Sequence, residues 1–496
     1  MKVAFAHEFD SELEVTAPEL CSAYPLVLDL DGTLLRTDLL LEAILLYLKR
    51  EPLGIFLCLI WACRGIAHLK HQLAQRCDIS VELLPVNEPL ASYAREAAER
   101  GRLVIAATAA SKELATKVCA RFSFISDILG SCEKVNLKGA RKAEALKQRF
   151  PAGFAYAGDS RADLPVWRAA RFGVFAGRDR SLLKPISDVT SLEADFSYSI
   201  ESARHWAKAL RLHQWAKNGL VFLPLMLAGH ALDLRAWIVC VGTFAALGLS
   251  ASATYVVNDL FDLEADRHHW SKRGRPFATG SIPIPHGVVG SAILLTLGLT
   301  LGFLSGGLPV LSALLLYCMV TLSYSLGLKR VPVLDVTILA ALFTMRLGLG
   351  SVAAQVRLSS WLAVFSMFLF LSLALAKRST EIGRKSAVGS DGNHGRGYIA
   401  ADGPMVAALG VSSALAAVLL MVLYLINEAF AGTLYPSPQL LWAAPVFIGL
   451  WLGRIWLLCG RGILNDDPVA FAVTDRTSIF LGFGVLASFA AAAAIA

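Results

Sequence analysis

The chain has 496 residues, of which 55% are hydrophobic and 17% are charged. Soluble globular proteins carry about 25% charged residues, so this composition indicates a membrane protein and excludes a disordered, fibrous or disulfide-scaffold chain. The formal net charge of +7 is modest for this length and requires no nucleic-acid partner, and the nine scattered cysteines lack metal-binding spacing.

The first 200 residues alternate strand-like and helix-like segments of ordinary charge. A short apolar strand, Tyr24–Leu30, leads into Asp29 and Asp31. Two carboxylates spaced i, i+2 at a strand end point the same way, and this arrangement suits one nucleophile and one general acid/base beside a metal ion. A second apolar strand, Leu103–Ala107, ends at Thr108.

Two further features follow in the same unit. A basic helix start runs from Lys138 to Lys142, and the strand Phe154–Ala157 leads into a loop that contains Asp159 and Asp163. Open parallel sheets bind their ligands beyond the carboxyl ends of the strands. The sequence therefore predicts one site at this edge of an α/β sheet.

This ordered set of motifs resembles the haloacid-dehalogenase-like hydrolases over about residues 20–185. The resemblance implies a Rossmann-like parallel sheet with a helical cap, about residues 36–100, inserted after the first motif. It implies that Asp29 attacks a phosphate, that Asp31 protonates the leaving group and later activates water, and that Thr108 binds phosphate oxygens.

The same resemblance implies a magnesium site. Mg²⁺ would lie between Asp29 and Asp159, with Asp163 in support. Lys142 best matches the basic residue of the family, and Lys138 is its rival. The phosphate-binding residues are generic, so they do not identify the substrate.

The run Ile55–Cys63 is apolar but only nine residues long, too short to cross a bilayer. We interpret it either as the core of a helical insertion or as an interfacial helix that rests on the membrane. Trp61 and the nearby Lys70 and His71 suit the second interpretation.

Long apolar stretches separated by short polar loops recur from about residue 218 onward. Most are near the ~20 residues that a helix needs to cross a bilayer, which predicts an all-helical membrane bundle of about nine spans. The predicted spans are residues 218–234, 236–257, 284–304, 308–326, 333–354, 358–376, 404–426, 438–458 and 477–496.

The loops between these spans predict an orientation. The even-numbered loops carry fourteen lysines and arginines, whereas the odd-numbered loops carry two, Arg235 and Arg357. Because basic residues concentrate on the cytoplasmic side, we expect a multi-pass protein of the inner (cytoplasmic) membrane. Its N-terminal unit would be cytoplasmic and its C-terminus outside.

The most informative stretch carries Asn258, Asp259, Asp262 and Asp266 at the end of the second span. The spacing i, i+3, i+7 places the three aspartates on one face of a helix. Hard oxygen ligands on few carboxylates suit Mg²⁺, with a substrate phosphate completing the coordination shell. A solvated helix end is the alternative, but acidic clusters are unexpected in a loop that is otherwise basic.

Residues on either side of this motif are candidates for binding phosphate. Lys272, Arg273 and Arg275 follow it, and Lys217 and Asn218 lie at the start of the first span. The alternatives are an ordinary basic cytoplasmic loop and an interfacial Trp/Lys anchor.

The pattern NDxxDxxxD on a multi-span bundle resembles the UbiA superfamily of intramembrane prenyltransferases over about residues 204–496. Most members hold an isoprenyl diphosphate through Mg²⁺ and transfer the prenyl group to an aromatic acceptor. They use a second aspartate-rich motif on a later loop. Here that loop starts Ala376-Lys377-Arg378, basic where acid is expected.

This departure, together with Gln214-Trp215-Ala216-Lys217-Asn218 and the residues around Asp262, resembles one branch, the decaprenyl-phosphate phosphoribosyltransferases. The resemblance implies phosphoribosyl pyrophosphate as the donor and a polyprenyl phosphate as the acceptor. Lys377 and Arg378 suit an additional phosphate. The last cytoplasmic loop, ending near Asp475, closes the site in this interpretation, and a helix cap is the equal alternative for Asp475.

The predicted architecture has two fused units, a cytoplasmic phosphatase-like unit over residues 1–200 and a transmembrane transferase unit over residues 204–496. The predicted function is Mg²⁺-dependent transfer of 5-phosphoribosyl to a polyprenyl lipid. The first unit would then remove the 5-phosphate, on the way to lipid-linked arabinose for envelope arabinan or a glycolipid. One alternative makes the first unit idle or regulatory, and another is an aromatic prenyltransferase. Lipid chain length and assembly into a homo-oligomer stay open.

Overall fold

The computed structural model of the chain describes residues 23–133, 135–198, 202–230, 232–388, 397–432, 435–464, 468–472 and 474–494. The contacts within the chain define two units. Unit 1 comprises Met1–Trp206 and Leu260–His286, and unit 2 comprises Ala207–Asp259 and Gly287–Ala496. The segment Leu260–His286 therefore belongs by its contacts to unit 1, although its flanking sequence belongs to unit 2.

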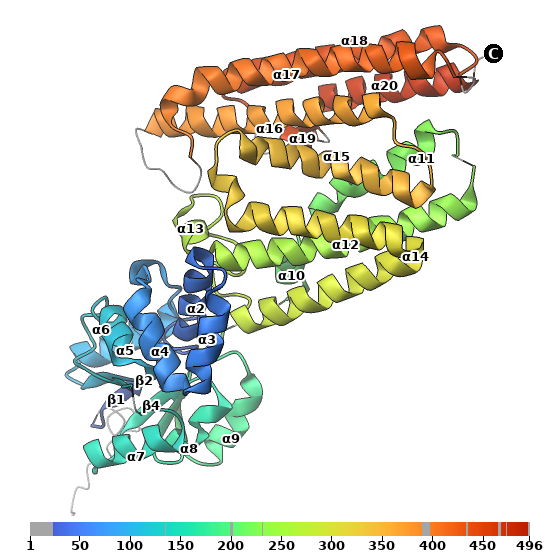
Figure 1. Cartoon of the computed structure of the whole chain (residues 1–496). Coiled ribbons are helices and arrows are strands. Elements are labelled where there is room, and N and C mark those ends of the chain that lie inside the picture. The colour runs from blue at the N-terminus through green and yellow to red at the C-terminus, as the bar shows by residue number, and fades with distance from the viewer. Residues whose placement is uncertain are drawn as a thin grey trace, which may run out of the picture. The chain divides into compact units, whose positions relative to one another are not determined.

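A six-stranded parallel sheet forms the centre of unit 1, with the spatial order β3-β2-β1-β4-β5-β6. Figure 1 labels its strands β1, β2 and β4. The sequence predicted strands at the positions of β1, β2 and β4, and the parallel α/β sheet is confirmed. The strands are β1 (Leu26–Leu28), β2 (Val104–Ser111), β3 (Asp127–Ser131), β4 (Ala155–Gly158), β5 (Phe172–Phe175) and β6 (Ser191–Asp195).

The sheet is buried on both faces, which explains why its central strands are continuously apolar. Because successive side chains alternate between faces, Leu26 and Leu28 join one core, and Val27 joins the other. The first core is closed by α5 (Glu88–Glu99) and α6 (Lys112–Cys119), and the second by α7 (Ala140–Arg149), α8 (Leu164–Trp167) and α9 (Leu183–Ser187).

Three helices between β1 and α5 form a separate small core. They are α2 (Leu39–Arg50), α3 (Gly54–Cys63) and α4 (Ile66–Arg76). Ala43, Tyr47, Trp61 and Leu73 are buried among them. This cluster lies within the stretch predicted to form the cap, and α5 in the same stretch packs on the sheet instead.

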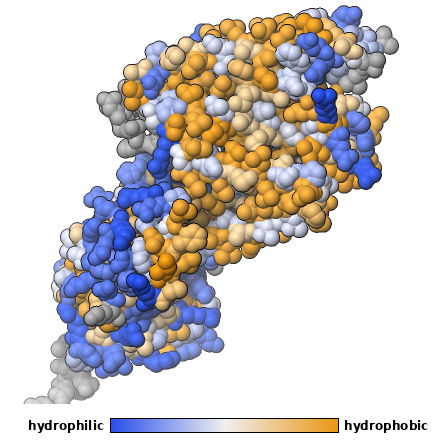
Figure 2. Space-filling view, in the orientation of Figure 1, coloured by the Kyte–Doolittle hydropathy of each residue, from blue (hydrophilic) through white to orange (hydrophobic). Residues whose placement is uncertain are grey.

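Unit 2 is helical, and Figure 2 shows that hydrophobic side chains dominate its visible surface. Among the described residues, seven helices are long and apolar enough to cross a membrane. They are α12 (Leu234–Phe261), α14 (Ile284–Leu326), α15 (Leu334–Ala354), α16 (Ser360–Val388), α17 (Gly403–Tyr424), α18 (Ala443–Gly460) and α20 (Arg476–Ala494). These helices support an integral membrane protein.

The long helix α14 contains two of the predicted spans. Its 43 residues are interrupted at Gly306 and Gly307, whose backbone angles are not helical. Gly307 has φ +67°, a left-handed conformation that glycine adopts at little cost, and Pro309 begins the second arm. The chain therefore turns between two apolar arms without a polar loop.

The first predicted span is wrong as a long helix. In place of residues 218–234, the structure has a 3-10 helix at Leu212–Phe222 followed by the five-residue α11 (Leu223–Leu227). Pro224 lies in the first turn of α11, where its missing N–H costs little, and it cannot continue an α-helix that comes from the N-terminal side.

Candidate functional site

Three aspartates meet at the carboxyl edge of the sheet in unit 1. Asp29 directly follows β1, and Asp159 and Asp163 follow the adjacent strand β4. Each offers one carboxylate oxygen within 4.8 Å of the others, so together they could hold a metal ion. Carboxylate oxygens at this spacing fit Mg²⁺.

Lys142 lies beside this cluster. Its Nζ is 2.8 Å from Asp29 Oδ2 and 3.6 Å from Asp163 Oδ1, and only 1% of the residue is exposed. It lies near the start of α7, which places its side chain on the buried face of that helix. Lys138 precedes the helix and is exposed. The geometry therefore favours Lys142 over Lys138 as the basic residue of this site.

Tyr156 is a buried member of the site that the sequence motifs did not indicate. It lies in β4, and its hydroxyl group donates to Asp163 Oδ1 at 2.8 Å and accepts from Lys142 Nζ at 2.9 Å. A tyrosine inside an apolar strand looks like an ordinary core residue. Only the alternation of the strand, which points Tyr156 towards α7, could have suggested this role.

Asp31 and Thr108 complete the predicted set. Asp31 Oδ1 accepts from the Leu39 backbone N–H at the start of α2, at 2.9 Å. Thr108 is fully buried, and its Oγ1 accepts from the Ala110 N–H at 3.0 Å. The prediction that the strand ends at Thr108 is wrong: β2 continues to Ser111, because its pairing with β3 resumes there after an irregular step.

Burial dominates the electrostatics of this edge. It raises the pKa of Asp31 to about 8, and it raises the pKa of Asp29 despite the opposing effect of Lys142. Burial, reinforced by the charge of Asp163, raises the pKa of Asp159 well above its usual range. Burial alone would lower the pKa of Lys142, but the attraction of Asp29 and Asp163 raises it. Lys142 alone does not offset the neighbouring carboxyl groups, so a bound cation would favour their ionised forms.

The acidic motif of the transferase sequence does not lie on one continuous helix. The helix α12 ends at Phe261, Asp262 has non-helical backbone angles, and α13 (Leu263–His268) begins after it. The predicted common helical face for Asp259, Asp262 and Asp266 is therefore wrong, because the helix is broken between the first aspartate and the last.

Each residue of this motif contacts a basic side chain. Within unit 2, Lys329 Nζ donates to Asn258 Oδ1 at 3.3 Å, and Arg211 pairs with Asp259. Within unit 1, Lys49 Nζ is 3.0 Å from Asp262 Oδ1, and Arg275 is 2.6 Å from Asp266 Oδ2. These carboxylates and the amide have the oxygen chemistry that Mg²⁺ prefers.

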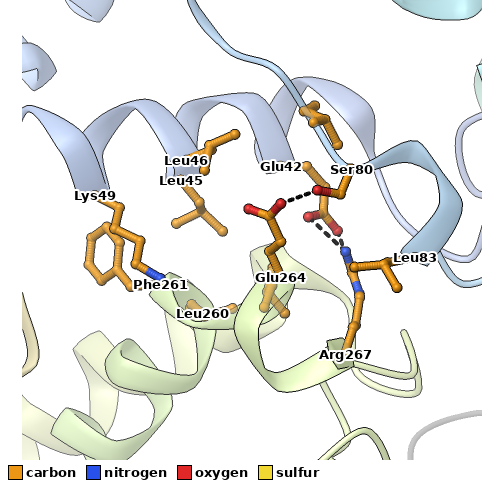
Figure 3. A pocket seen from close by; sticks show the side chains of 12 residues that line it. Glu42, Leu45, Leu46, Lys49, Ser80, Leu83, Leu260, Phe261, Glu264 and Arg267 are labelled. Atoms are coloured by element: carbon orange, nitrogen blue, oxygen red, sulfur yellow. Dashed lines mark hydrogen bonds and ion pairs between the residues drawn. The ribbon is translucent and has the colours of Figure 1, made fainter. Parts of the chain in front are cut away.

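A pocket of unit 1 lies beside this motif, between α2 and α13 (Figure 3). The two terminal nitrogens of the Arg267 guanidinium group donate to Glu42, at 2.6 and 3.1 Å, and Ser80 donates to Glu264. The Arg267 and Glu42 side chains are each only 7% exposed. This buried, two-point ion pair fixes α13 against α2.

The other predicted phosphate ligands are spread over several elements. Asn218 is buried, Lys217 lies 5.9 Å from the Phe343 ring centre, and Lys272 and Arg273 lie between α13 and α14. Lys377 and Arg378 lie on α16, and Arg378 is buried against Asp335 at 2.6 Å and pairs with Glu381. Their phosphate-binding roles stay predictions.

Asp475 has a clear local role. It accepts from the Ser478 N–H at 2.8 Å at the start of α20, as an N-cap does, and it pairs with Arg454 at 2.6 Å. These contacts match the helix-cap interpretation.

Arg346 is a buried cation that the sequence analysis missed. It lies on α15, is 4% exposed, and donates to Asn218 Oδ1 at 3.1 Å, the Leu342 carbonyl oxygen at 2.6 Å and the Tyr317 hydroxyl at 2.9 Å. These partners, all among the described residues, are neutral. A charge inside an apolar span is itself a functional signal, and the position of Arg346 in the run 333–354 could have given it.

A family model described as the UbiA prenyltransferase family matches residues 220–494, just over half of the chain. The chain belongs to the UbiA prenyltransferase family. A UbiA-type transferase unit therefore occupies the part of the chain that contains the membrane helices.

Three relatives extend this assignment. The uncharacterized protein y4nM of Sinorhizobium fredii is 38% identical over 94% of this chain and 90% of its own length. Nodulation protein NoeC of Azorhizobium caulinodans is 33% identical over 56% of this chain and 90% of its length. The decaprenyl-phosphate phosphoribosyltransferase of Corynebacterium glutamicum is 37% identical over 35% of this chain and 54% of its length, so the match spans about half of that relative.

Proposed function

We propose that this UbiA-family protein transfers 5-phosphoribosyl from phosphoribosyl pyrophosphate to a polyprenyl phosphate. The observation that carries the proposal is the 37% identity to a decaprenyl-phosphate phosphoribosyltransferase within a UbiA-family chain. The buried Arg346, whose described partners are neutral, supports a substrate with an anionic group in the membrane unit.

The reaction breaks the bond between the sugar C1 and the diphosphate oxygen, and a phosphate oxygen of the lipid forms the new bond to C1. Mg²⁺ held by the acidic motif would neutralise the charge that develops on the departing diphosphate. Asp259, Asp262 and Asp266 are the residues suited to hold it. Arg211, which pairs with Asp259 within unit 2, is suited to the diphosphate oxygens.

We further propose that unit 1 is a phosphatase of the haloacid-dehalogenase-like type that removes the 5-phosphate from the lipid-linked product. Asp29 would attack the phosphorus, and Asp31, with its pKa raised to about 8, would hold the proton that the leaving sugar oxygen needs. Lys142 fixes and neutralises Asp29, and Asp159 and Asp163 complete the metal site. The product would be a ribosyl lipid suited to epimerisation to arabinose.

The test of transfer uses the full chain in lipid nanodiscs with Mg²⁺, a polyprenyl phosphate and phosphoribosyl pyrophosphate labelled in the ribose. We expect label to enter the lipid phase, and we expect Asp262→Asn to abolish this. Asp188→Asn, an exposed aspartate outside both sites, is the matched control. Absence of label from the lipid phase, together with prenylation of an aromatic acceptor from an isoprenyl diphosphate, would overturn the proposal in favour of aromatic prenyl transfer.

The test of the phosphatase follows inorganic phosphate from the same lipid product. We expect Asp29→Asn to form the phosphoribosyl lipid at the wild-type rate and to release no phosphate from it. If the wild-type protein also leaves the 5-phosphate in place, unit 1 is idle or regulatory and this second proposal fails.

A further inference from the structure

The helix α3 carries an exposed apolar face in unit 1. Within ten residues, its outward side chains are 40% to 62% exposed, and Leu53 before it is 79% exposed. Contiguous apolar side chains of this kind are costly in water and mark a surface that another phase or molecule covers. The exposed residues are Leu53, Ile55, Phe56, Leu57, Leu59, Ile60 and, at the start of α4, Ile66.

The opposite side of α3 is fixed by packing, so the exposed face has a defined direction. Trp61 and Cys58 are buried, and the Trp61 ring centre lies 5.6 Å from that of Tyr47 on α2. Gly54 lies so close to Tyr47 that an added Cβ would be 2.5 Å from the Tyr47 ring. The side chains that point outward could not be turned inward without breaking this small core.

The length and charge of the helix favour one type of partner. Ten residues are too few to span a bilayer, but they suit a helix that lies in its interfacial layer. Arg50 and Arg64, one beyond each end of the apolar stretch, are exposed and match anionic lipid headgroups. The chain also carries its own membrane helices, so a bilayer is always present at high effective concentration.

We propose that α3 inserts its apolar face into the headgroup and upper acyl region of the bilayer in which the chain resides. Ile55, Phe56, Leu59 and Ile60 enter the lipid, and the flanking arginines contact the headgroups. The proposal is independent of the substrates, because it rests on the surface of α3 alone. It gives unit 1 an attachment to the membrane besides its covalent connections to unit 2.

The test is site-directed spin labelling of the full chain in nanodiscs that contain anionic lipid. Cys21, Cys63 and Cys132 are first changed to serine, and then Phe56→Cys or Ile60→Cys carries the label. Glu144→Cys, exposed on the sheet-packed helix α7, is the control. At positions 56 and 60 we expect oxygen to relax the label more than a water-soluble nickel complex does, and at position 144 we expect the opposite.

Water-like accessibility at positions 56 and 60 would overturn the proposal. Strong spin–spin broadening between labels at position 56 would also overturn it, because that result would show a second copy of the chain on this face. A variant with Phe56→Glu and Ile60→Glu gives an independent readout, since neither side chain is in the buried core. In the labelled background, we expect it to move a probe at Leu57→Cys from lipid to water, while the melting temperature stays unchanged.

Discussion

At the scale of residues, Lys142 lies at the centre of the site in unit 1. Its ammonium group is buried among acidic side chains and is 2.8 Å from Asp29 and 2.9 Å from the Tyr156 hydroxyl. A buried cation of this kind both positions a nucleophile and offsets the charge that a phosphate brings. The contribution of Lys142 to the rate of phosphate release should therefore be much larger than that of an exposed lysine nearby.

We predict that Lys142→Met lowers the rate constant for phosphate release by roughly a hundredfold or more, the usual effect of removing one preorganised charged group. Lys138→Met should change it by less than about twofold, because an exposed charge is screened by solvent. Single-turnover phosphate release with an aryl phosphate and Mg²⁺ measures both. Equal losses in the two variants would contradict the assignment.

A second prediction follows from the raised pKa of Asp159. The folded protein disfavours the ionised form of this carboxyl group. When no metal is bound, the group therefore lowers the free energy of unfolding at every pH above about 4, its pKa in the unfolded chain. Asp159→Asn should therefore raise the melting temperature measured at pH 7 in EDTA. For a unit of this size, the expected rise is about 2–4 °C for each kcal/mol by which the free energy of unfolding increases.

The same variant should lose the stabilisation that Mg²⁺ gives to the wild-type protein. Thermal unfolding of the full chain with and without Mg²⁺ measures both effects, and Asp188→Asn should change neither. A lower melting temperature for Asp159→Asn in EDTA would show that its carboxylate stabilises the metal-free fold.

The strand-end aspartates could be located from the sequence because their positions depend on short-range order. A parallel strand followed by polar residues places them at the carboxyl edge whatever the rest of the chain does. Tyr156 and Arg346 could not be assigned in this way. Their roles arise from partners that lie far along the chain, such as Asn218 for Arg346.

At the scale of elements, the spacing of Asp259, Asp262 and Asp266 predicted one helix, and the structure has two. The break at Asp262 coincides with contacts from α2, more than two hundred positions earlier in the chain, where Lys49 binds Asp262. Local periodicity contains no information on such a partner. The packing of α2 against α13 in unit 1 could therefore not be predicted from the sequence.

We predict that Glu42→Gln weakens transfer, because it leaves the buried Arg267 without its charged partner. Breaking a buried ion pair of this kind lowers the free energy of unfolding by about 3 kcal/mol. Arg267→Gln should have a comparable effect. The double variant should lose less than the sum, since it removes both charges. The wild type, the two single variants and the double variant form a double-mutant cycle, which is measured by transfer assays and melting temperatures.

Strict additivity in that cycle would refute the coupling. A matched cycle on the exposed pair Lys117–Asp78 in the same unit should show little interaction.

At the scale of the whole molecule, the chain joins a unit with an aspartate cluster at the edge of a parallel sheet to a UbiA-type unit. The composition and the loop charges predicted a membrane protein and most of its spans, because hydropathy over about 20 residues is a strong local signal. The short first segment at Leu212–Leu227 escaped that signal, since Pro224 lies within an otherwise apolar run. The break in α14 at Gly306 and Gly307 falls between two of the predicted spans.

Fusion predicts that a lipid product is processed by the chain that made it. We expect wild-type nanodiscs to release phosphate with little delay after transfer, because tethering raises the local product concentration. A mixture of Asp29→Asn nanodiscs and Asp262→Asn nanodiscs, each with one intact site, should accumulate phosphoribosyl lipid. Equal phosphate release from the mixture and the wild type would show that the product exchanges freely between particles.

The helix α2 touches both sets of acidic residues in unit 1. Its first residue, Leu39, donates to Asp31, and Lys49 binds Asp262. Ten residues of α-helix separate these contacts, about 15 Å along a stiff rod. Because a helix is stiff along its axis, an axial displacement of Lys49 would also displace the Leu39 amide that donates to Asp31. The helix α2 therefore holds one residue of each acidic set within unit 1, Asp31 near its first residue and Asp262 near its last turn.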